Sequence, residues 1–388
     1  MNVKLKDICT INPKAPCLSD DLMVSFVPMT KVGEHGEFDP SDVKKCVDVK
    51  KGFTSFTNGD ILFAKITPCM ENGKGAIAIS LKNGYGFGST EFHVLRPDYT
   101  QVTSEWLYYL TSWSEFRRVA EKNMTGSAGQ KRVPKLFLEK FEIDLPSLNE
   151  QKERTNILIK ISKLIENRKQ QLKQLDELVK ARFVEMFGNV GTDEKSWRLA
   201  RLGDVCKINP KKTDDTRLKS DLQVSFVPMP AVSEKGEIDS SEIKVYDEVK
   251  TGFTYFREDD VLFAKITPCM ENGKGAVAKG LCNGIGFGST EFHVLRPIEN
   301  ISNSYWIYAV TSFEQFRVDA ASNMTGSAGQ RRVPASFLES YRVSIPPIEL
   351  QNEFANFVKQ VDKSKFAVQK ALDEAQTLFD SLMQQYFS

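Results

Sequence analysis

The segment Leu62-Phe63-Ala64-Lys65-Ile66-Thr67-Pro68 occurs twice in this chain of 388 residues, because it returns unchanged at 262–268. The identity extends outward: residues 61–97 match residues 261–297 except at positions 61, 77, 79, 80, 82 and 85. A repeat at this distance is a duplicated domain, since solenoid units recur every ~20–50 residues. The sequence therefore predicts two homologous domains.

The repeat continues on both sides of this segment. Residues 123–130 return unchanged at 323–330. The tripeptide Ile11-Asn12-Pro13 matches Ile208-Asn209-Pro210, at an offset of 197 in place of 200. The second copy therefore has three extra residues near 211–220, which we place in a surface loop.

Each copy begins with a mixed pattern. Residues 1–146 contain short β-forming pieces, such as residues 91–95, that are bounded by turn signals such as Asn72-Gly73. Residues 104–122 bring apolar side chains to one face at helical spacing, which predicts one helix. The pattern is typical of an α+β domain.

Each copy ends in a long helical pattern. Ser147 and Glu150 form a capping-box signal at the start of the first helix, and Gly188 stands where a glycine is expected after its end. A helix of about 40 residues is about 60 Å long, and a sustained apolar stripe is costly to expose. We therefore expect the two helices to pack as an antiparallel intramolecular coiled coil, with the copies related by a pseudo-two-fold axis.

The predicted order is a first domain at 1–146, a helix at 147–188, a second domain at 189–346 and a helix at 347–388. The predicted seam of the coiled coil consists of Leu158, Ile161, Ile165, Leu172, Leu175, Val179, Val358, Val361, Val368, Leu372, Phe379 and Leu382.

Composition excludes several classes of protein. The seven cysteines include no Cys-x-x-Cys pair, and the three histidines suggest neither a metal site nor a histidine-based triad. No signal peptide or long apolar run is present, so we expect a cytoplasmic protein without a membrane partner. A net charge of +1 is low for an autonomous DNA-binding protein, but it is compatible with DNA binding beside a basic partner.

The order of domain, helix, domain and helix resembles the specificity subunit of Type I DNA restriction–modification enzymes. Residues 62–68, residues 89–97 and the Leu145-Pro146 step before Glu150-Gln151 are similar to the target recognition domains of that family, as are their counterparts at 262–268, 289–297 and 345–351. The resemblance implies that each domain reads one half of a bipartite DNA site. It also implies that the helices set the spacer and bind two methyltransferase subunits, which restriction/translocase subunits join.

The near-identity of the two domains differs from most of that family. Two equal domains related by a pseudo-two-fold axis predict equal half-sites in inverted orientation, and therefore a nearly palindromic site. No cofactor loop and no base-flipping catalytic motif is evident in the sequence. We expect a non-catalytic chain that binds no cofactor, with S-adenosylmethionine on the partner methyltransferase subunits.

DNA reading needs donors for phosphates and paired polar groups for base edges. Residues 65–74 offer these groups, although a hairpin with a type I′ Asn-Gly turn is an alternative. Residues 89–93 are interpreted as part of a strand, in which Glu91 accepts from cytosine or forms a cross-strand salt bridge. Residues 125–132 combine small residues with two cations, and a flexible surface loop is the alternative.

The predicted DNA-binding residues are Lys65, Thr67, Asn72, Lys74, Thr90, Glu91, His93, Thr125, Ser127, Gln130, Lys131 and Arg132 in the first copy, and Lys265, Thr267, Asn272, Lys274, Thr290, Glu291, His293, Thr325, Ser327, Gln330, Arg331 and Arg332 in the second. Two other functions stay open at this point. One is a tandem scaffold that binds protein or glycan, and the other is a self-contained nuclease or methyltransferase.

Overall fold

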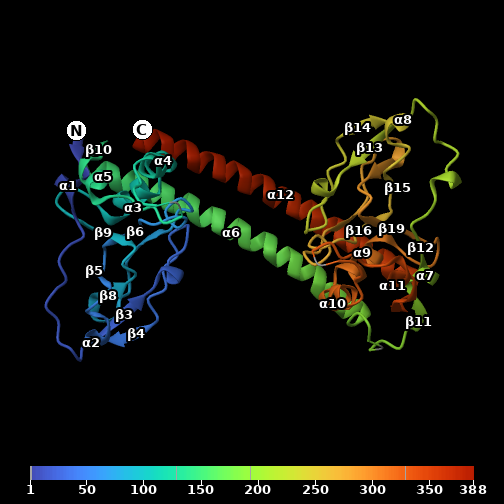
Figure 1. Cartoon of the computed structure of the whole chain (residues 1–388), viewed down its shortest axis with the longest axis horizontal. Coiled ribbons are helices and arrows are strands. Elements are labelled where there is room, and N and C mark those ends of the chain that lie inside the picture. Colours follow the sequence, from blue (N-terminus) through green and yellow to red (C-terminus); the bar gives the residue numbers. More distant parts are fainter. Residues whose placement is uncertain (1, 128, 193, 328) are drawn as a thin grey trace. The chain divides into compact units, whose positions relative to one another are not determined.

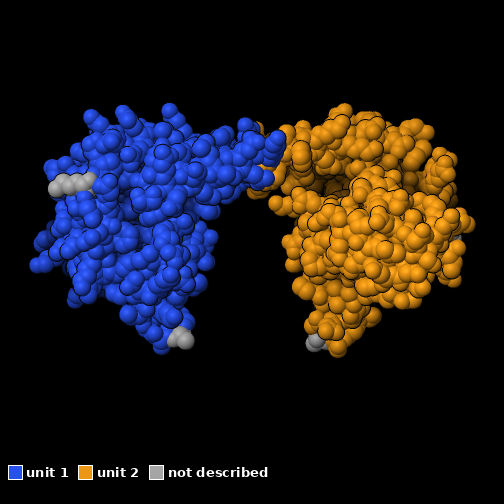
Figure 2. Space-filling model, turned by 90° about the horizontal axis from the view of Figure 1, so that it is seen from above, with its two compact units in different colours: residues 1–169, 370–388 blue, residues 170–369 orange. Residues whose placement is uncertain are grey.

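The computed structural model describes residues 2–127, 129–192, 194–327 and 329–388. The chain divides into two compact units, Met1–Lys169 with Lys370–Ser388 and Gln170–Gln369 (Figure 2). Each unit contains one copy of the repeat and a part of each of the two long helices, α6 (Leu148–Phe187) and α12 (Ile348–Phe387) (Figure 1).

The first domain is built from short strands and short helices. Its strands are β1 (Asn2–Lys4), β2 (Cys9–Ile11), β3 (Met23–Val27), β4 (Val43–Lys45), β5 (Thr54–Thr57), β6 (Ile61–Ala64), β7 (Gly75–Ile77), β8 (Tyr85–Gly88), β9 (Phe92–Pro97) and β10 (Glu142–Asp144). Its helices are α1 (Leu5–Ile8), η1 (Met29–Lys31), α2 (Cys46–Val49), η2 (Lys82–Gly84), α3 (Ser104–Ser112), α4 (Ser114–Lys122) and α5 (Lys135–Lys140).

The strands form two four-stranded sheets and one short pair. The order β2-β9-β6-β7 is antiparallel throughout, whereas the order β4-β3-β8-β5 contains the parallel pair β3–β8. Strands β1 and β10, which begin and end the sequence of the domain, pair with each other. This mixture of strands and helices confirms the predicted α+β class.

Strand β6 lies in the middle of the layers, which explains why it is apolar at every position. Ile61 and Phe63 face a core formed with α1, α3, α4 and α5, whereas Leu62 and Ala64 face the core between the two sheets. Because side chains alternate across a strand, a strand covered on both faces needs apolar residues without interruption. All four residues of β6 are buried.

The glycines of β8 permit close contacts with β5 and β3, its two neighbours in the same sheet. A Cβ added to Gly86 would lie 2.2 Å from the ring of Phe56, and one added to Gly88 would lie 2.2 Å from the carbonyl oxygen of Val27. The ring of Phe56 therefore covers the space that a side chain on β8 would fill. A glycine is required here by contact rather than by its backbone angles.

The prediction of a single helix over residues 104–122 is wrong, because the chain leaves the helical conformation at Trp113 (φ −61°, ψ 130°) and forms α3 and α4. The hydroxyl groups of Thr111 and Ser112 both donate to the carbonyl oxygen of Tyr108 at 2.9 Å. Such bonds compete with the helical pattern and favour a helix end. The break lets Trp113 bury its side chain in the core.

The second domain repeats this arrangement. Its strands are β11 (Arg198–Arg201), β12 (Cys206–Ile208), β13 (Gln223–Val227), β14 (Ile243–Val245), β15 (Thr254–Arg257), β16 (Val261–Ala264), β17 (Gly275–Val277), β18 (Ile285–Gly288), β19 (Phe292–Pro297) and β20 (Arg342–Ile345). Its helices are α7 (Leu202–Val205), η3 (Lys212–Asp214), η4 (Met229–Ala231), α8 (Tyr246–Val249), η5 (Cys282–Gly284), α9 (Ser304–Ser312), α10 (Glu314–Ser322) and α11 (Ala335–Ser340). The sheet orders are β12-β19-β16-β17, β14-β13-β18-β15 and β11-β20.

In the first unit, the start of α6 packs against the end of α12. Ile161 and Ile165 form one cluster with Ala375, and Leu158 lies in the domain core together with Met383. The ring centres of Phe387 and Trp106 lie 4.3 Å apart. The first domain therefore contacts both the helix that follows it in the chain, α6, and the last turn of α12.

In the second unit, the end of α6 packs against the start of α12. Phe183 lies against Phe354 at 5.6 Å between ring centres, and Arg182 donates to Glu353 at 2.9 Å. Lys365 pairs with Asp176. Residues later in α6 thus meet residues earlier in α12, so the helices run antiparallel.

The packing within each unit confirms the predicted antiparallel coiled coil. Every residue of the predicted seam is at least half-buried, and Leu158, Ile161, Ile165 and Val361 are fully buried. The predicted capping box is present, because Glu150 accepts from the Ser147 amide at 2.9 Å. Gly188, with φ 78°, follows the last residue of α6 as predicted. Within the described residues, no helix combines the length and apolar character that crossing a membrane requires.

The burial of Leu158 yields a stability test. We expect Leu158→Ala to destabilise the first unit by about 2–5 kcal/mol, because the substitution removes buried methyl groups and leaves a cavity. Leu164→Ala is the matched control on the same helix, since Leu164 is 41% exposed, and we expect its effect to stay within about 0.5 kcal/mol. Urea unfolding of both variants measures the difference. Equal unfolding midpoints would contradict the packing of α6 on the first domain.

Candidate nucleic-acid interface

Strand pairing places two of the predicted DNA-binding segments side by side. Strands β6 and β9 are antiparallel with Ala64 opposite Phe92, so the residue after β6 meets the residue before β9. The Lys65 amide donates to the Glu91 carbonyl oxygen at 2.9 Å. The segments 65–74 and 89–93 therefore share one end of the sheet.

The third segment joins the same place. The Val133 amide donates to the Lys65 carbonyl oxygen at 2.8 Å, and the Thr67 amide donates to the Lys131 carbonyl oxygen at 3.1 Å. The hydroxyl group of Thr67 also donates to the carbonyl oxygen of Gly129 at 3.2 Å. Residues 65–74, 89–93 and 125–132 thus form one surface, which we call the three-loop cluster.

The loop 125–132 is closed by its own backbone. Thr125 and Arg132 exchange two backbone hydrogen bonds of 3.0 and 2.8 Å. Gly126 has a φ of 127°, and a Cβ there would lie 2.8 Å from the Gln130 carbonyl oxygen, so only glycine fits. A Cβ at Gly129 would meet nothing within 4 Å. The backbone at Gly129 is therefore open to close approach by a ligand. Ala128 and Ala328 lie outside the described residues.

Glu91 and Arg132 form an ion pair within the three-loop cluster. Arg132 donates from Nε and Nη2 to the two carboxylate oxygens of Glu91, at 2.9 and 2.8 Å. These hydrogen bonds hold the pKa of the Glu91 carboxyl below its usual value. Glu91 thus forms a salt bridge, but not the cross-strand one that the alternative expected, because Glu91 precedes β9 and Arg132 lies in the loop 125–132.

The prediction that His93 and His293 contact DNA is wrong, because both side chains are buried. The His93 Nε2 lies 2.8 Å from the Val133 carbonyl oxygen, and its Nδ1 lies 3.0 Å from the Asn12 side-chain nitrogen. The ring therefore donates to Val133 and accepts from Asn12. His93 holds the loop segment at Val133 against the sheet and does not reach a ligand.

The remaining predicted residues of the cluster differ in exposure. Asn72, Thr90, Thr125, Ser127, Gln130 and Lys131 are exposed, whereas Lys65, Thr67, Lys74, Glu91 and Arg132 are half-buried. The amine of Lys74 lies 3.4 Å from the Met29 carbonyl oxygen, so it is directed toward η1. The type I′ turn alternative is wrong, because Gly73 has a positive φ while Asn72 does not.

The second domain repeats the three-loop cluster. Lys265, Thr267 and residues 329–333 make the same backbone contacts, and Arg332 pairs with Glu291 at 2.9 and 2.7 Å. Among its predicted residues, Asn272, Thr290, Thr325, Ser327, Gln330 and Arg331 are exposed, and Lys265, Thr267, Lys274, Glu291 and Arg332 are half-buried. Arg331, which replaces Lys131, approaches Glu271 at 3.4 Å.

Sequence reasoning missed two residues that support the cluster. Asn12 donates to His93 and accepts from the Val94 amide at 3.0 Å. The buried Arg117 donates to the Met70 carbonyl oxygen at 2.6 Å and so supports the loop 65–74 from beneath; burial lowers the pKa of Arg117 to about 10. The recurrence of both residues, as Asn209 and Arg317, is the only sequence signal that pointed to them.

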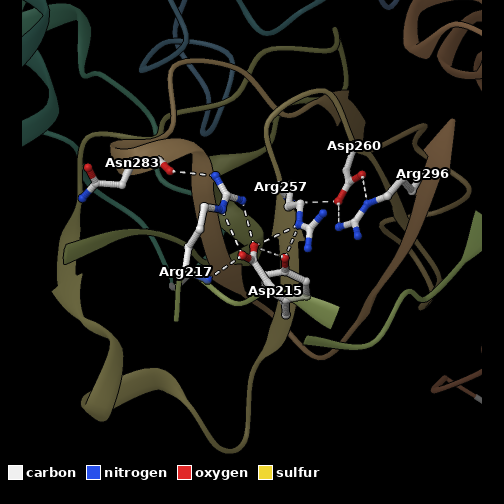
Figure 3. A network of polar contacts seen from close by, with 7 residues as sticks. Asp215, Arg217, Arg257, Asp260, Asn283 and Arg296 are labelled. Atoms are coloured by element: carbon white, nitrogen blue, oxygen red, sulfur yellow. Dashed lines mark hydrogen bonds and ion pairs between the residues drawn. The ribbon is translucent and has the colours of Figure 1, made fainter. Parts of the chain in front are cut away.

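The second domain also has a polar network around Asp215, and only part of this network has equivalent residues in the first domain (Figure 3). Asp215, from the longer loop of this copy, accepts from Arg217, Arg257 and the hydroxyl group of Tyr255. These hydrogen bonds, chiefly those from Arg217, hold the pKa of the Asp215 carboxyl well below its usual range. In the first domain Ser55 and Thr57 occupy the positions of Tyr255 and Arg257. The extra loop is therefore anchored to β15.

Two neighbouring arginines complete this network. Arg296 donates to the two carboxylate oxygens of the buried Asp260 at 2.8 and 2.7 Å, and Arg217 approaches the Asn283 carbonyl oxygen at 3.4 Å. The first domain keeps the corresponding Arg96–Asp60 pair. Across residues 2–127, 129–192, 194–327 and 329–388, no group of three His, Cys, Asp or Glu side chains is placed to share a metal ion.

Comparison with known proteins identifies the family. The sequence profile described as the Type I restriction modification DNA specificity domain matches residues 1–177 and again residues 194–375. The chain belongs to the Type I restriction–modification DNA specificity family. It contains two copies of the specificity domain of that family, and each copy holds one three-loop cluster.

Relatives and solved structures agree with this family. The specificity subunits of the Type I restriction enzymes EcoEI and EcoAI, both from Escherichia coli, are 38% identical over 204 residues and 40% identical over 196 residues. These matches cover 50% and 48% of this chain but only 33% and 32% of those proteins. The S subunit of a Type I restriction–modification system from M. genitalium has the same fold, with a TM-score of 0.56 at 13% identity, over 100% of this chain and 96% of that one.

The buried histidines make the stability of the specificity domains depend on pH. Burial lowers the pKa of His93 and of His293, so protonation favours the unfolded chain, in which the pKa is about 6.5. The stability gained from neutral histidine is complete above that pH and is lost as the pH falls toward the lower folded-state pKa. We therefore expect the melting temperature to fall as the pH is lowered below the unfolded-state histidine pKa of about 6.5.

The variant that carries both His93→Gln and His293→Gln checks this cause. It should be less stable at neutral pH but should lose part of the pH dependence. His35→Gln is the control, because His35 is exposed. If the double variant kept the full pH dependence, the buried histidines would not be its source.

Proposed function

We propose that this chain is the non-catalytic DNA-reading subunit of a Type I restriction–modification complex, in which each specificity domain reads one half of a bipartite site. The observation that carries the proposal is the convergence of three polar segments on one surface in each copy of a DNA specificity domain. Cations, amides and hydroxyl groups meet there beside the open backbone at Gly129. These are the groups that bind phosphates and base edges.

The partners follow from the family and from the long helices. We infer that two methyltransferase subunits bind along α6 and α12 and that restriction/translocase subunits join them. Relatives of this chain are named as specificity subunits of Type I restriction enzymes, and a specificity subunit requires catalytic partners. The low net charge of +1 is compatible with DNA binding that is shared with such a partner.

The near-identity of the copies points to a nearly palindromic site. The pairs Lys65/Lys265, Asn72/Asn272, Glu91/Glu291, Gln130/Gln330 and Arg132/Arg332 keep the same residue type in the two clusters. Two equal specificity domains that are related by a pseudo-two-fold axis would bind equal half-sites on opposite strands of the DNA. We propose that the coiled coil fixes an unread spacer, with half-site centres about 10 base pairs apart.

Methylome sequencing of a host that carries the system tests this function. We expect one bipartite methylated motif with inverted, nearly equal half-sites and a single spacer length. Two unrelated half-sites would show that recognition depends on the residues that differ between the copies. No motif at all, with binding to protein or glycan, would favour the alternative of a tandem scaffold.

The absence of a recognisable cofactor loop predicts that the catalytic cofactor belongs to the partner. We expect the isolated chain to bind no S-adenosylmethionine and to methylate no DNA, whereas the complex with the methyltransferase subunit does both. Calorimetric titration of the chain alone and of the complex measures this difference. Stoichiometric binding by the chain alone would contradict the non-catalytic assignment.

The exposed cation of the three-loop cluster gives a salt-dependence test. We expect Lys131→Ala to weaken DNA binding by the complex and to make the slope of log K against log salt shallower by about 1, as for one lost phosphate contact. Lys6→Ala is the control, because Lys6 is exposed in α1, near the Pro97 end of β9 and so away from the cluster. Equal slopes for the two variants would show that the loop 125–132 does not contact DNA.

A further inference from the structure

The hydrogen bonds of Arg132 leave a defined part of its guanidinium group available. A guanidinium group carries five N–H donors, one on Nε and two on each Nη. Glu91 accepts one from Nε and one from Nη2, and the Gln130 carbonyl oxygen accepts one from Nη1 at 3.1 Å. Among the residues that the structure describes, these three hydrogen bonds leave one N–H on Nη1 and one N–H on Nη2 available to a ligand.

The second domain leaves the same two donors. Arg332 donates from Nε and Nη2 to Glu291 at 2.9 and 2.7 Å, and from Nη1 to the Gln330 carbonyl oxygen at 3.2 Å. The side chains of Arg132 and Arg332 are 42% and 41% exposed. Both guanidinium groups are thus held in one orientation while a large part of each remains accessible.

We propose that Arg132 and Arg332 each read one guanine, and that Glu91 and Glu291 act as positioning residues that fix the plane of the guanidinium group. This inference rests on the proposed function. The two remaining N–H donors match the O6 and N7 acceptors that guanine presents in the major groove. The open backbone at Gly129 leaves room for the DNA to approach.

Charge favours a base edge over a phosphate at this position. The ion pair of Glu91 with Arg132 has no net charge, and the carboxylate would repel a phosphate group. The O6 and N7 acceptors of guanine carry no formal charge, so the Glu91 carboxylate would repel them less than it would repel a phosphate group. The exposed Lys131, and Arg331 in the second copy, supply the positive charge that suits a phosphate.

The inference has a consequence for the site. Because the two ion pairs have the same geometry, one guanine should occupy the equivalent position in each half-site, on opposite strands. Each carboxylate oxygen of Glu91 already accepts one hydrogen bond from Arg132, and the Glu91 side chain is only 25% exposed, so we assign Glu91 to holding Arg132. Glu91 therefore acts through Arg132 rather than on a base.

The experiment changes the first domain alone and uses the full chain with its methyltransferase partner. The complexes methylate a library of duplex DNA with random sequence, and the methylated molecules are sequenced. Arg132→Gln should reduce the preference for guanine over the other bases, at one position of one half-site, by about 10-fold or more. Glu91→Gln should weaken the same preference, while the second half-site stays unchanged as an internal control of folding.

Lys131→Gln is the matched control, because it removes the neighbouring cation and should lower methylation of all sequences without changing the motif. If Arg132→Gln instead lowered methylation uniformly and kept every base preference, Arg132 would contact a phosphate and the inference would be wrong. If Arg132→Gln gave no methylation, the mirror variant Arg332→Gln and the isosteric Glu91→Gln would decide, and unchanged guanine preference in both would overturn the inference. If the unaltered complex showed no bipartite motif, the proposed function itself would fail.

Discussion

The register of β6 against β9, with Ala64 opposite Phe92, decides which loops of the first specificity domain meet. It brings Lys65 to Glu91, and the backbone bond from Val133 to Lys65 then brings in the loop 125–132. A shift by one residue would turn Phe63 toward the core that now holds Leu62, and it would move Glu91 away from Arg132. The apolar core on both faces of β6 therefore fixes the position of polar groups at its end.

The long helices depend on the domains as much as on each other. The end of α12 is held by Trp106 of the first domain, and the end of α6 is held by Phe313 of the second. Each compact unit thus contains a specificity domain and one end of the coiled coil. A coiled coil can fix the distance between two half-sites only if each specificity domain packs closely against the helices. The contacts of Trp106 and Phe313 with the helix ends therefore fit the proposed role of the coiled coil.

Much of the fold could be predicted from the sequence, because it depends on patterns that are local or repeated. The duplication, the apolar seam of the helices and the caps at Ser147 and Gly188 follow from spacing alone. The break at Trp113 could not be predicted from the apolar spacing, since it depends on side-chain hydroxyl groups that bond to the Tyr108 carbonyl oxygen. The type I′ alternative for the turn at Asn72-Gly73 is wrong for a similar reason, because the path of a ten-residue connection depends on the tertiary contacts that it makes.

The candidate site shows the same division between local and tertiary information. The three polar segments were recognised separately by their residue types, but only strand pairing shows that they form one surface. Burial separated His93, which holds the loop, from Arg132, which faces outward, and polarity alone could not separate them. The anchoring of the extra loop by Asp215 depends on Tyr255 and Arg257, about 40 residues further along the chain.

Photo-cross-linking from the three-loop cluster is the most direct measurement of whether this surface contacts DNA. A photoreactive residue would replace Gln130 in one preparation and Gln330 in another, each assembled with the methyltransferase partner on a duplex that contains the methylated site. A probe at Lys6, which lies on α1, would serve as the comparison. We expect cross-links from Gln130 to one half-site and from Gln330 to the other, with none from Lys6. Cross-links from Lys6 alone would contradict it, because the DNA would then contact another face of the domain.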